Sequence, residues 1–259
     1  KWNWTNISTS LPFSPNDRPE APLELMQRRE RVIVIDTYMP ILGLLPWLRK
    51  SHPLRGCTAQ QTVSYLVKRY LSPKQHILDE CMKFWHEQFD QKPFHCIHLR
   101  GLDKGVEAAN FEELNQQCIS NLDEADQSLP ILVLTDDANI YREMSSRYGS
   151  RAIFTSSTRG SGKTGIHLLE GAKGQSLGQE IMFDSYLATF ADRFFGVASS
   201  NVATMISYLK DWPQGHCTLV GSSALTSLSI FSGYISAKAA VISALPMPLQ
   251  GNIWKLAED

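Results

Sequence analysis

Short apolar runs alternate with amphipathic patterns from residue 93 onward, and this alternation restricts the fold more than any other feature of the chain. Between the runs, apolar residues recur at the spacing of one helix face, as Phe111, Leu114 and Cys118 do. Continuous apolar strands separated by amphipathic helices are typical of a parallel sheet with helices on both faces. The sequence therefore predicts an α/β, Rossmann-like domain over residues 93–259. Its expected strands cover residues 94–100, 131–135, 152–155, 194–198 and 218–220.

The first 92 residues have a different pattern of apolar and polar residues, and this pattern predicts a separate, smaller part of the protein. Residues 1–30 are rich in Pro, Ser and Asn and predict an irregular lead-in, whereas residues 31–37 (RVIVIDT) predict a buried strand. A helix is expected from Thr58, where T-A-Q-Q forms a capping box, and a second helix after Ser72-Pro73. We therefore place a domain boundary between residues 92 and 93.

Composition and charge exclude several classes of protein. With 43% hydrophobic residues the chain can bury a core, so disorder over most of its 259 residues is excluded. Its 25 basic and 26 acidic residues argue against a nucleic-acid partner held by a global positive field. The five cysteines form no CxxC pair and predict neither a disulfide framework nor a zinc site. The apolar stretch 224–245 contains Lys238 and favours a buried helix over a membrane span, so we expect no transmembrane segment in this chain.

Polar residues gather where the first predicted strand of the sheet ends. The strand period of two places His98 and Arg100 on one face. Asp103, Lys104 and Glu107 follow shortly afterwards. An arginine fork suits phosphate oxygens, whereas a lysine acts as a point charge. Because ligands of parallel α/β sheets bind beyond the carboxyl ends of the strands, this junction is a candidate site, the alternative being a solvated loop whose charges pair with each other.

Two other strand ends carry polar candidates. Asp136 and Asp137 follow the second strand of the sheet, where paired carboxylates bind a metal or sugar hydroxyls, or where one of them caps the next helix. Ser199, Ser200 and Asn201 follow the fourth strand and open a helix. They are either an anion site, built from free backbone amides and hydroxyls, or ordinary N-cap residues.

A carboxylate is predicted on an apolar helical face at Asp184. It lies one turn after Ile181 and two turns after Leu177 in the pattern L-G-Q-E-I-M-F-D-S-Y-L. A bare charge there would cost several kcal/mol to bury, so Asp184 must be paired or hydrogen-bonded. Structural pairing and ligand binding both fit this requirement.

The segment G-S-G-K-T (160–164) ends like a phosphate-binding P-loop around Lys163. The complete pattern requires glycine at position 157, which is Ser157, and the glycines up to position 174 do not favour a helix from Lys163. We expect a flexible loop over the main site. A P-loop-type phosphotransferase centred on Lys163 is kept as an alternative.

The order of these motifs resembles that of a known superfamily. The segment C-I-H-L-R-G-L-D-K-G-V-E-A-A (96–109) looks like the H-x-R-x-x-D-K…E-A-A segment of the α-1,6-fucosyltransferases. Their relatives include the nodulation fucosyltransferases and the protein O-fucosyltransferases. The motifs L-T-D-D (134–137), I-M-F-D-S-Y-L (181–187) and A-S-S-N (198–201) follow in that family's order. Upstream, V-S-Y-L-V-K-R-Y-L-S-P (63–73) is similar to the helix pair before its first motif, so the resemblance covers roughly residues 58–210.

This resemblance implies a GT-B-like glycosyltransferase with a reduced, acceptor-side N-terminal domain over residues 1–92. Such an enzyme transfers L-fucose from GDP-fucose to a glycan or glycoprotein acceptor with inversion, and it needs no metal or other cofactor. By the same analogy, Arg100 holds the β-phosphate and neutralises the charge of departing GDP. His98 and Asp184 recognise the guanosine side.

The remaining roles come from the same analogy. Ser199, Ser200 and Asn201 bind diphosphate oxygens, and Asp136 and Asp137 lie near the sugar and the acceptor. In the first motif, Glu107 is the candidate base, with Asp103 and Lys104 beside it.

Two departures from the family pattern leave alternatives open. Glu107 stands one residue closer to the Asp-Lys pair than in the α-1,6 enzymes, and no glycine-rich loop of the family's first domain precedes residue 93. A truncated product, a compact variant and a non-catalytic relative that binds sugar nucleotide all fit these departures. The expected compartment is the cytoplasm for a bacterial protein, with the Golgi lumen as the alternative.

Overall fold

The computed structural model describes residues 51–54, 57, 59–101, 110–162, 165–166 and 174–221. The chain divides into two compact units, one made of residues 1–62 and 224–259 and the other of residues 63–223. The sheet lies in the second unit. The expected strand at 31–37 and the expected helix at 224–245 lie outside the described residues.

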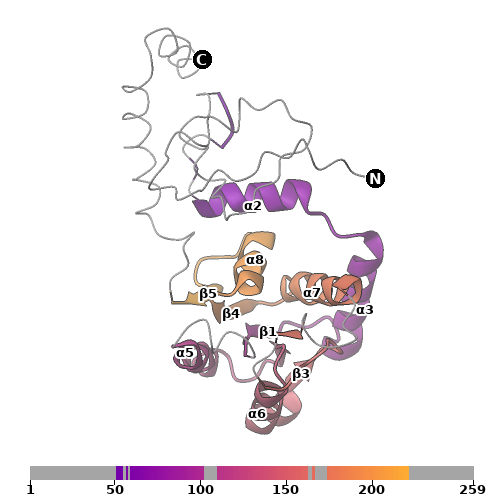
Figure 1. The fold of residues 1–259 in the computed structure, drawn as a ribbon, viewed down its shortest axis with the longest axis vertical. Coiled ribbons are helices and arrows are strands. Elements are labelled where there is room, and N and C mark those ends of the chain that lie inside the picture. The colour runs from indigo at the N-terminus through magenta and orange to yellow at the C-terminus, as the bar shows by residue number, and fades with distance from the viewer. Residues whose placement is uncertain are drawn as a thin grey trace, which may run out of the picture. The chain divides into compact units, whose positions relative to one another are not determined.

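Five parallel strands form the centre of the second unit, in the order β3-β2-β1-β4-β5 (Figure 1). The strands are β1 His95–His98, β2 Ile131–Leu134, β3 Ala152–Phe154, β4 Arg193–Val197 and β5 Cys217–Val220. The central strand β1 pairs in parallel with both β2 and β4. The prediction of a parallel α/β sheet is confirmed, and the strand order is compatible with a Rossmann-like fold.

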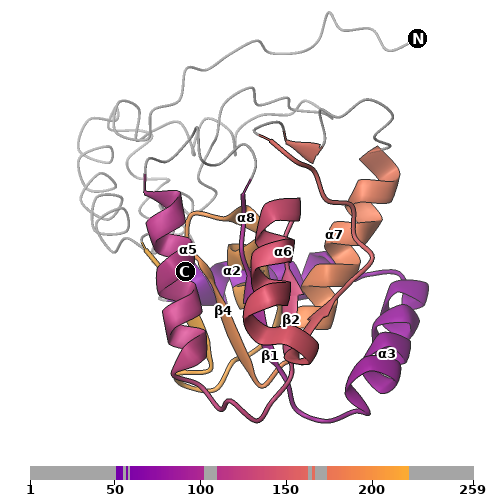
Figure 2. The ribbon, with the colours of Figure 1, turned by 90° about the horizontal axis from the view of Figure 1, so that it is seen from below.

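Helices cover both faces of this sheet. Their bounds are α2 Ala59–Tyr70, α3 Gln75–Phe89, α5 Phe111–Asp123, α6 Ala138–Tyr148, α7 Gly174–Ala188 and α8 Asn201–Leu209, with a 3-10 turn η3 at Gly149–Arg151. Helices α5 and α6 pack on one face, whereas α3, α7 and α8 pack on the other (Figure 1). Helix α3 lies beside α7 (Figure 2).

Strand β2 shows why the strands are continuous apolar runs. Leu132 and Leu134 belong to the core formed with α3, α7 and α8. Ile131 and Val133 belong to the core formed with α5 and α6. All four side chains are buried, because a strand between two helical layers has no face in water.

Helix α3 is part of the sheet unit. Its Cys81 and Phe89 lie in the same core cluster as Phe94 and Phe194. The rings of Phe89 and Phe94 stack with their centroids 4.0 Å apart. The compact unit that holds the sheet covers residues 63–223 and so includes α3. The domain boundary between residues 92 and 93 stays a prediction.

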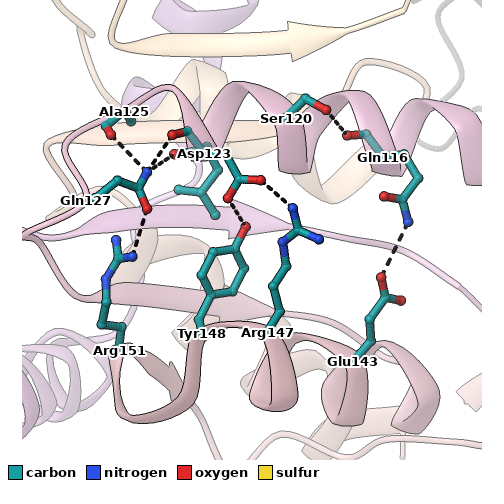
Figure 3. Close-up of polar contacts among 10 residues, drawn as sticks. Gln116, Ser120, Asp123, Ala125, Gln127, Glu143, Arg147, Tyr148 and Arg151 are labelled. Carbon is teal, nitrogen blue, oxygen red and sulfur yellow. Dashed lines mark hydrogen bonds and ion pairs between the residues drawn. The ribbon is translucent and has the colours of Figure 1, made fainter.

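A polar network holds the C-terminal end of α5 (Figure 3). The two hydrogens of Gln127 Nε2 are shared among three backbone oxygens at this end, those of Leu122, Asp123 and Ala125, at 3.1, 2.7 and 2.9 Å from the nitrogen. The Oε1 atom of Gln127 accepts from Arg151 Nη1 at 2.8 Å. One side chain thus satisfies carbonyls that a helix end leaves without partners in the helix.

The same network joins α5 to α6. The Asp123 carboxylate accepts from Tyr148 Oη at 2.8 Å and from the Arg147 guanidinium (Figure 3). Burial and the neighbouring carboxylate raise the pKa of Tyr148 to about 12, so the phenol remains a donor at neutral pH. These contacts join α5 to α6 within the helical layer on the face of the sheet opposite α7.

We expect Gln127→Ala to lower the free energy of unfolding by about 1 kcal/mol, because the α5 carbonyls lose their common donor. Urea unfolding followed by circular dichroism measures this change. Gln116→Ala, on the same helix, is the matched control and should stay within about 0.5 kcal/mol of the parent. Equal stability of the two variants would show that the network does not hold the end of α5.

Candidate functional site

The sheet order places a topological switch at the carboxyl end of β1. From β1 the chain runs to β2 and β3 on one side, and it returns through α7 to β4 and β5 on the other side. In open α/β sheets, ligands bind in the crevice outside such a switch. The residues that follow β1 and β4 therefore border the expected place of a site.

A cavity of about 160 Å³ opens at this edge of the sheet, next to α7. This cavity is lined by four residues that the sequence analysis predicted as site residues from different motifs. They are His98, Arg100, Asp136 and Asp184. Both His98, the last residue of β1, and Arg100, two residues beyond the end of the strand, line this cavity.

Apolar side chains complete the walls of the cavity. Leu177 and Ile181 line it together with Asp184, as their spacing by turns of α7 predicted. Val202 comes from α8, and Ile166 comes from the segment between β3 and α7. Apolar walls with a few polar groups are the usual composition of a small-molecule site.

Asp136 joins the ends of β1 and β2. Its Oδ1 accepts from the backbone nitrogen of Gly101 at 3.2 Å, and its Oδ2 lies 3.7 Å from Arg100 Nε. Asn115 of α5 donates to the Arg100 backbone oxygen at 2.9 Å, which holds the same turn from the other face. The Arg100 side chain is only 19% exposed and lies beside the Asp136 carboxylate.

The two carboxylates after β2 do different things. Asp137 is buried, and its Oδ1 accepts from Asn139 N at 2.7 Å, so Asp137 is the N-cap of α6. Only Asp136 of the pair lines the cavity. Helix capping, one of the readings that the sequence left open, therefore applies to Asp137, and its expected place beside the sugar is not supported by this geometry.

The two carboxylate oxygens of Asp184 have different surroundings in the described part of the chain. Its Oδ2 accepts from Ser157 Oγ at 2.9 Å. Its Oδ1 is buried and has no hydrogen-bond partner within the described part of the chain. Burial raises the pKa of Asp184 to about 6, against the opposing effects of the Ser157 and Thr155 hydroxyls and of Arg159. The structure thus presents a carboxylate, ionised at neutral pH, with an unused acceptor.

His98 is a neutral group at physiological pH. Burial and, to a smaller extent, the positive charge of Arg100 lower the pKa of His98 to about 4. Its Nδ1 is buried and, among the described residues, has no hydrogen-bond partner. His98 can therefore offer a hydrogen bond to a ligand but not a charge.

The serine-rich end of β4 is only partly connected to this cavity. Ser200 is fully buried and is the N-cap of α8, where its Oγ accepts from Ala203 N at 3.5 Å. Ser199 and Asn201 are exposed beside it. The cavity reaches this helix at Val202. The diphosphate contacts of Ser199, Ser200 and Asn201 remain a prediction.

The segment after β3 contributes lining residues that the sequence reasoning did not select. Ser157 and Thr158 line the cavity, as does Glu180 on α7. The Glu180 carboxylate accepts from Thr158 N at 2.7 Å and from Thr158 Oγ1 at 3.1 Å. Ser157 and Thr158 follow β3, so the tendency of ligands to bind beyond the carboxyl ends of parallel strands could have found them. Glu180 could have been found from its position one turn before Asp184 on α7.

Several predicted residues lie outside the described part of the chain. They are Asp103, Lys104, Glu107 and Lys163. The glycine segment before Lys163 is described up to Gly162. Within it, Gly160 N donates to Asp136 O and Gly160 O accepts from Ala138 N, both at 2.9 Å, so this glycine is bound to the turn after β2.

Among the described residues, no group of three or more His, Cys, Asp or Glu side chains is arranged to hold a metal ion. No helix in the described ranges has the length and apolar character needed to cross a membrane.

Comparison of the chain with known proteins does not identify this site. No protein-family model matches the chain, and no curated protein matches it at a significant level. The resemblance to fucosyltransferases therefore stays a prediction from the motifs.

We expect Gly101→Ala to lower the free energy of unfolding by about 1–3 kcal/mol, because the added Cβ would overlap the Asp137 carboxylate. Thermal unfolding measures the change. Gly178→Ala is the matched control: its Cβ meets nothing within 4 Å, and alanine favours the α7 helix. If Gly101→Ala melted at or above the parent temperature, the close approach of β1 and β2 at this turn would be disproved.

Proposed function

We propose that the chain is a fucosyltransferase-like glycosyltransferase that transfers L-fucose from GDP-fucose to a glycan or protein hydroxyl, with inversion and without a metal. The observation that carries the proposal is the convergence of His98, Arg100, Asp136 and Asp184 on one cavity at the switch point of the sheet. A nucleoside diphosphate needs a cation for its phosphates and polar groups for its base. Residues of both kinds line this cavity.

Asp184 and His98 are assigned to the guanine base. The Oδ1 atom of Asp184, which has no hydrogen-bond partner in the described ranges, is an acceptor, and the Watson–Crick edge of guanine carries N–H donors that suit it. His98 stays neutral and adds a hydrogen bond. Leu177, Ile181 and Val202 provide apolar surface for the ring. A base with donors at this edge is favoured over adenine, whose ring nitrogen there is an acceptor.

Arg100 is assigned to the β-phosphate. In an inverting transfer the bond between the anomeric carbon and the phosphate oxygen breaks, and negative charge grows on the departing GDP. A preorganised guanidinium meets that charge, and loss of one such donor costs on the order of 2.7–4 kcal/mol in the transition state. Ser199, Ser200 and Asn201 are the proposed further contacts of the diphosphate.

The acceptor side is assigned from the first motif. A sugar or protein hydroxyl is a weak nucleophile, and a positioned carboxylate that takes its proton contributes about 10²–10⁴-fold. Glu107 is the proposed base, with Asp103 and Lys104 beside it. Asp136 is proposed to face the sugar, and Asp137 is proposed to keep Asp136 in place by capping α6.

We expect Arg100→Ala to weaken GDP binding by about 10–100-fold and to abolish transfer, because a hydrogen bond to a charged group contributes about 1.5–3 kcal/mol. Calorimetry with GDP, GDP-fucose, GDP-mannose, UDP and ATP, with and without magnesium, measures the affinities. Arg142→Ala, an exposed arginine of α6, is the matched control and should bind GDP like the parent.

Other results of this panel would replace the proposal. GDP-fucose binding without transfer to any acceptor of a glycan and glycoprotein panel would indicate a binding protein without catalysis. Magnesium-dependent ATP binding that Lys163→Ala abolishes would indicate a P-loop phosphotransferase. Unchanged GDP affinity in Arg100→Ala would remove Arg100 from the site.

We expect the affinity for GDP to fall as the pH drops through about 6, because protonation of Asp184 places a hydrogen on its carboxylate, whose oxygens are the acceptors for the base. Above that pH the carboxylate is ionised and accepts from the base. The phosphate itself titrates near pH 6, so the measured quantity is the ratio of wild-type affinity to that of Asp184→Asn at each pH. A ratio independent of pH between 5 and 8 would contradict the contact of Asp184 with the base.

A further inference from the structure

We propose that Arg159 is a positioning residue that holds segment 155–158 against α7 and thereby decides which oxygen of Asp184 a ligand can reach. Arg159 itself does not line the cavity, whereas Ser157 and Thr158, on the segment it holds, do. That the ligand is GDP rests on the proposed function, but the positioning role does not.

The Arg159 guanidinium forks across the segment. Its Nη1 donates to Ser157 O at 3.0 Å and its Nη2 donates to Thr155 O at 2.9 Å. It also lies over two rings, 4.9 Å from the centroid of Tyr141 on α6 and 5.8 Å from that of Phe154 on β3. A planar fork stacked on aromatic faces is a geometry that lysine cannot reproduce. Arg159 therefore ties the segment to β3 and α6.

Helix α7 holds the same segment from its other side. Ser157 Oγ donates to Asp184 Oδ2, and Thr155 Oγ1 lies 3.1 Å from Ser157 Oγ. Both the amide and the hydroxyl of Thr158 donate to Glu180. Oδ2 of Asp184 is bonded to Ser157, whereas Oδ1 has no partner within the described part of the chain, so Oδ1 is the oxygen left for a ligand.

Charge links Arg159 to Asp184 as well. The positive charge of Arg159 lowers the pKa of Asp184, against the larger effect of burial. In return, Asp184 and Glu180 oppose the lowering of the Arg159 pKa that burial causes. The other titratable and charged groups around Asp184 are Cys81 on α3, Cys96 and His98 on β1, Arg100 after β1 and Asp136 after β2.

The test compares Arg159→Met, Arg159→Lys and the control Arg142→Met in the ligand-free full chain. Hydrogen exchange of the Thr158 amide reports the hold on the segment, and the ¹³C chemical shift of the Asp184 carboxyl reports its titration. In Arg159→Met we expect exchange to be at least tenfold faster, because the segment loses both of its hydrogen bonds to the charged guanidinium. We expect the Asp184 midpoint to move upward in the same variant.

Arg159→Lys separates charge from geometry. It keeps the positive charge, so the Asp184 midpoint should stay nearer to that of the wild type, but it loses the fork, so the Thr158 amide should exchange faster. Arg142→Met should leave both readouts unchanged. Thermal unfolding of each variant confirms that the comparison is made between folded proteins.

The outcomes are distinct from those of the proposed function. If either the exchange of Thr158 or the titration of Asp184 is the same in Arg159→Met as in the wild type, the positioning role is overturned. A third measurement is the affinity for GDP, expected to be about tenfold weaker in Arg159→Met. If the wild type binds no GDP, the proposed function fails, while the two ligand-free readouts still decide the role of Arg159.

Discussion

Parallel pairing of β1 with two neighbours is the constraint on which the candidate site depends. His98, the last residue of β1, is in register with Leu134 of β2 and with Gly196 of β4. β1 is buried on both faces. The charged side chain of this segment, that of Arg100, therefore lies beyond the strand, where the hydrogen-bonded ladder stops. The register brings the ends of these strands to one edge of the sheet. The cavity lies at that edge.

Charge burial at this edge is stabilised by groups that the fold itself supplies. Asp136 accepts from the Gly101 amide and lies beside Arg100, and one oxygen of Asp184 accepts from Ser157. Burying a carboxylate without such partners would cost several kcal/mol. The other oxygen of Asp184 has no hydrogen-bond partner among the residues that the structure describes. Proteins leave buried polar atoms without hydrogen bonds mainly at functional sites. Asp184 therefore contributes to the stability of the fold through one oxygen and offers the other oxygen to a ligand.

Sequence reasoning identified some of these residues and missed others, for physical reasons. Arg100 and His98 could be placed on one face because the strand period is local, and Asp184 could be aligned with Ile181 because the helix period is local. Asp136 and Asp137 could not be told apart, since both precede the same helix and only the path of the chain at Gly101 separates them. Contacts between Thr158 and Glu180 leave no periodic signal.

The amino-acid sequence by itself determined the parallel α/β class, the approximate positions of its strands and the face that α5 presents to the sheet. Those properties follow from the alternation of apolar and polar residues over a few positions. Only the tertiary structure decided that Asp137 caps a helix while Asp136 lines a cavity, and that Arg159 reaches the segment bonded to Asp184. These contacts depend on how α6 and α7 pack on the sheet, and no short stretch of sequence encodes a distance between elements that meet only in the folded chain.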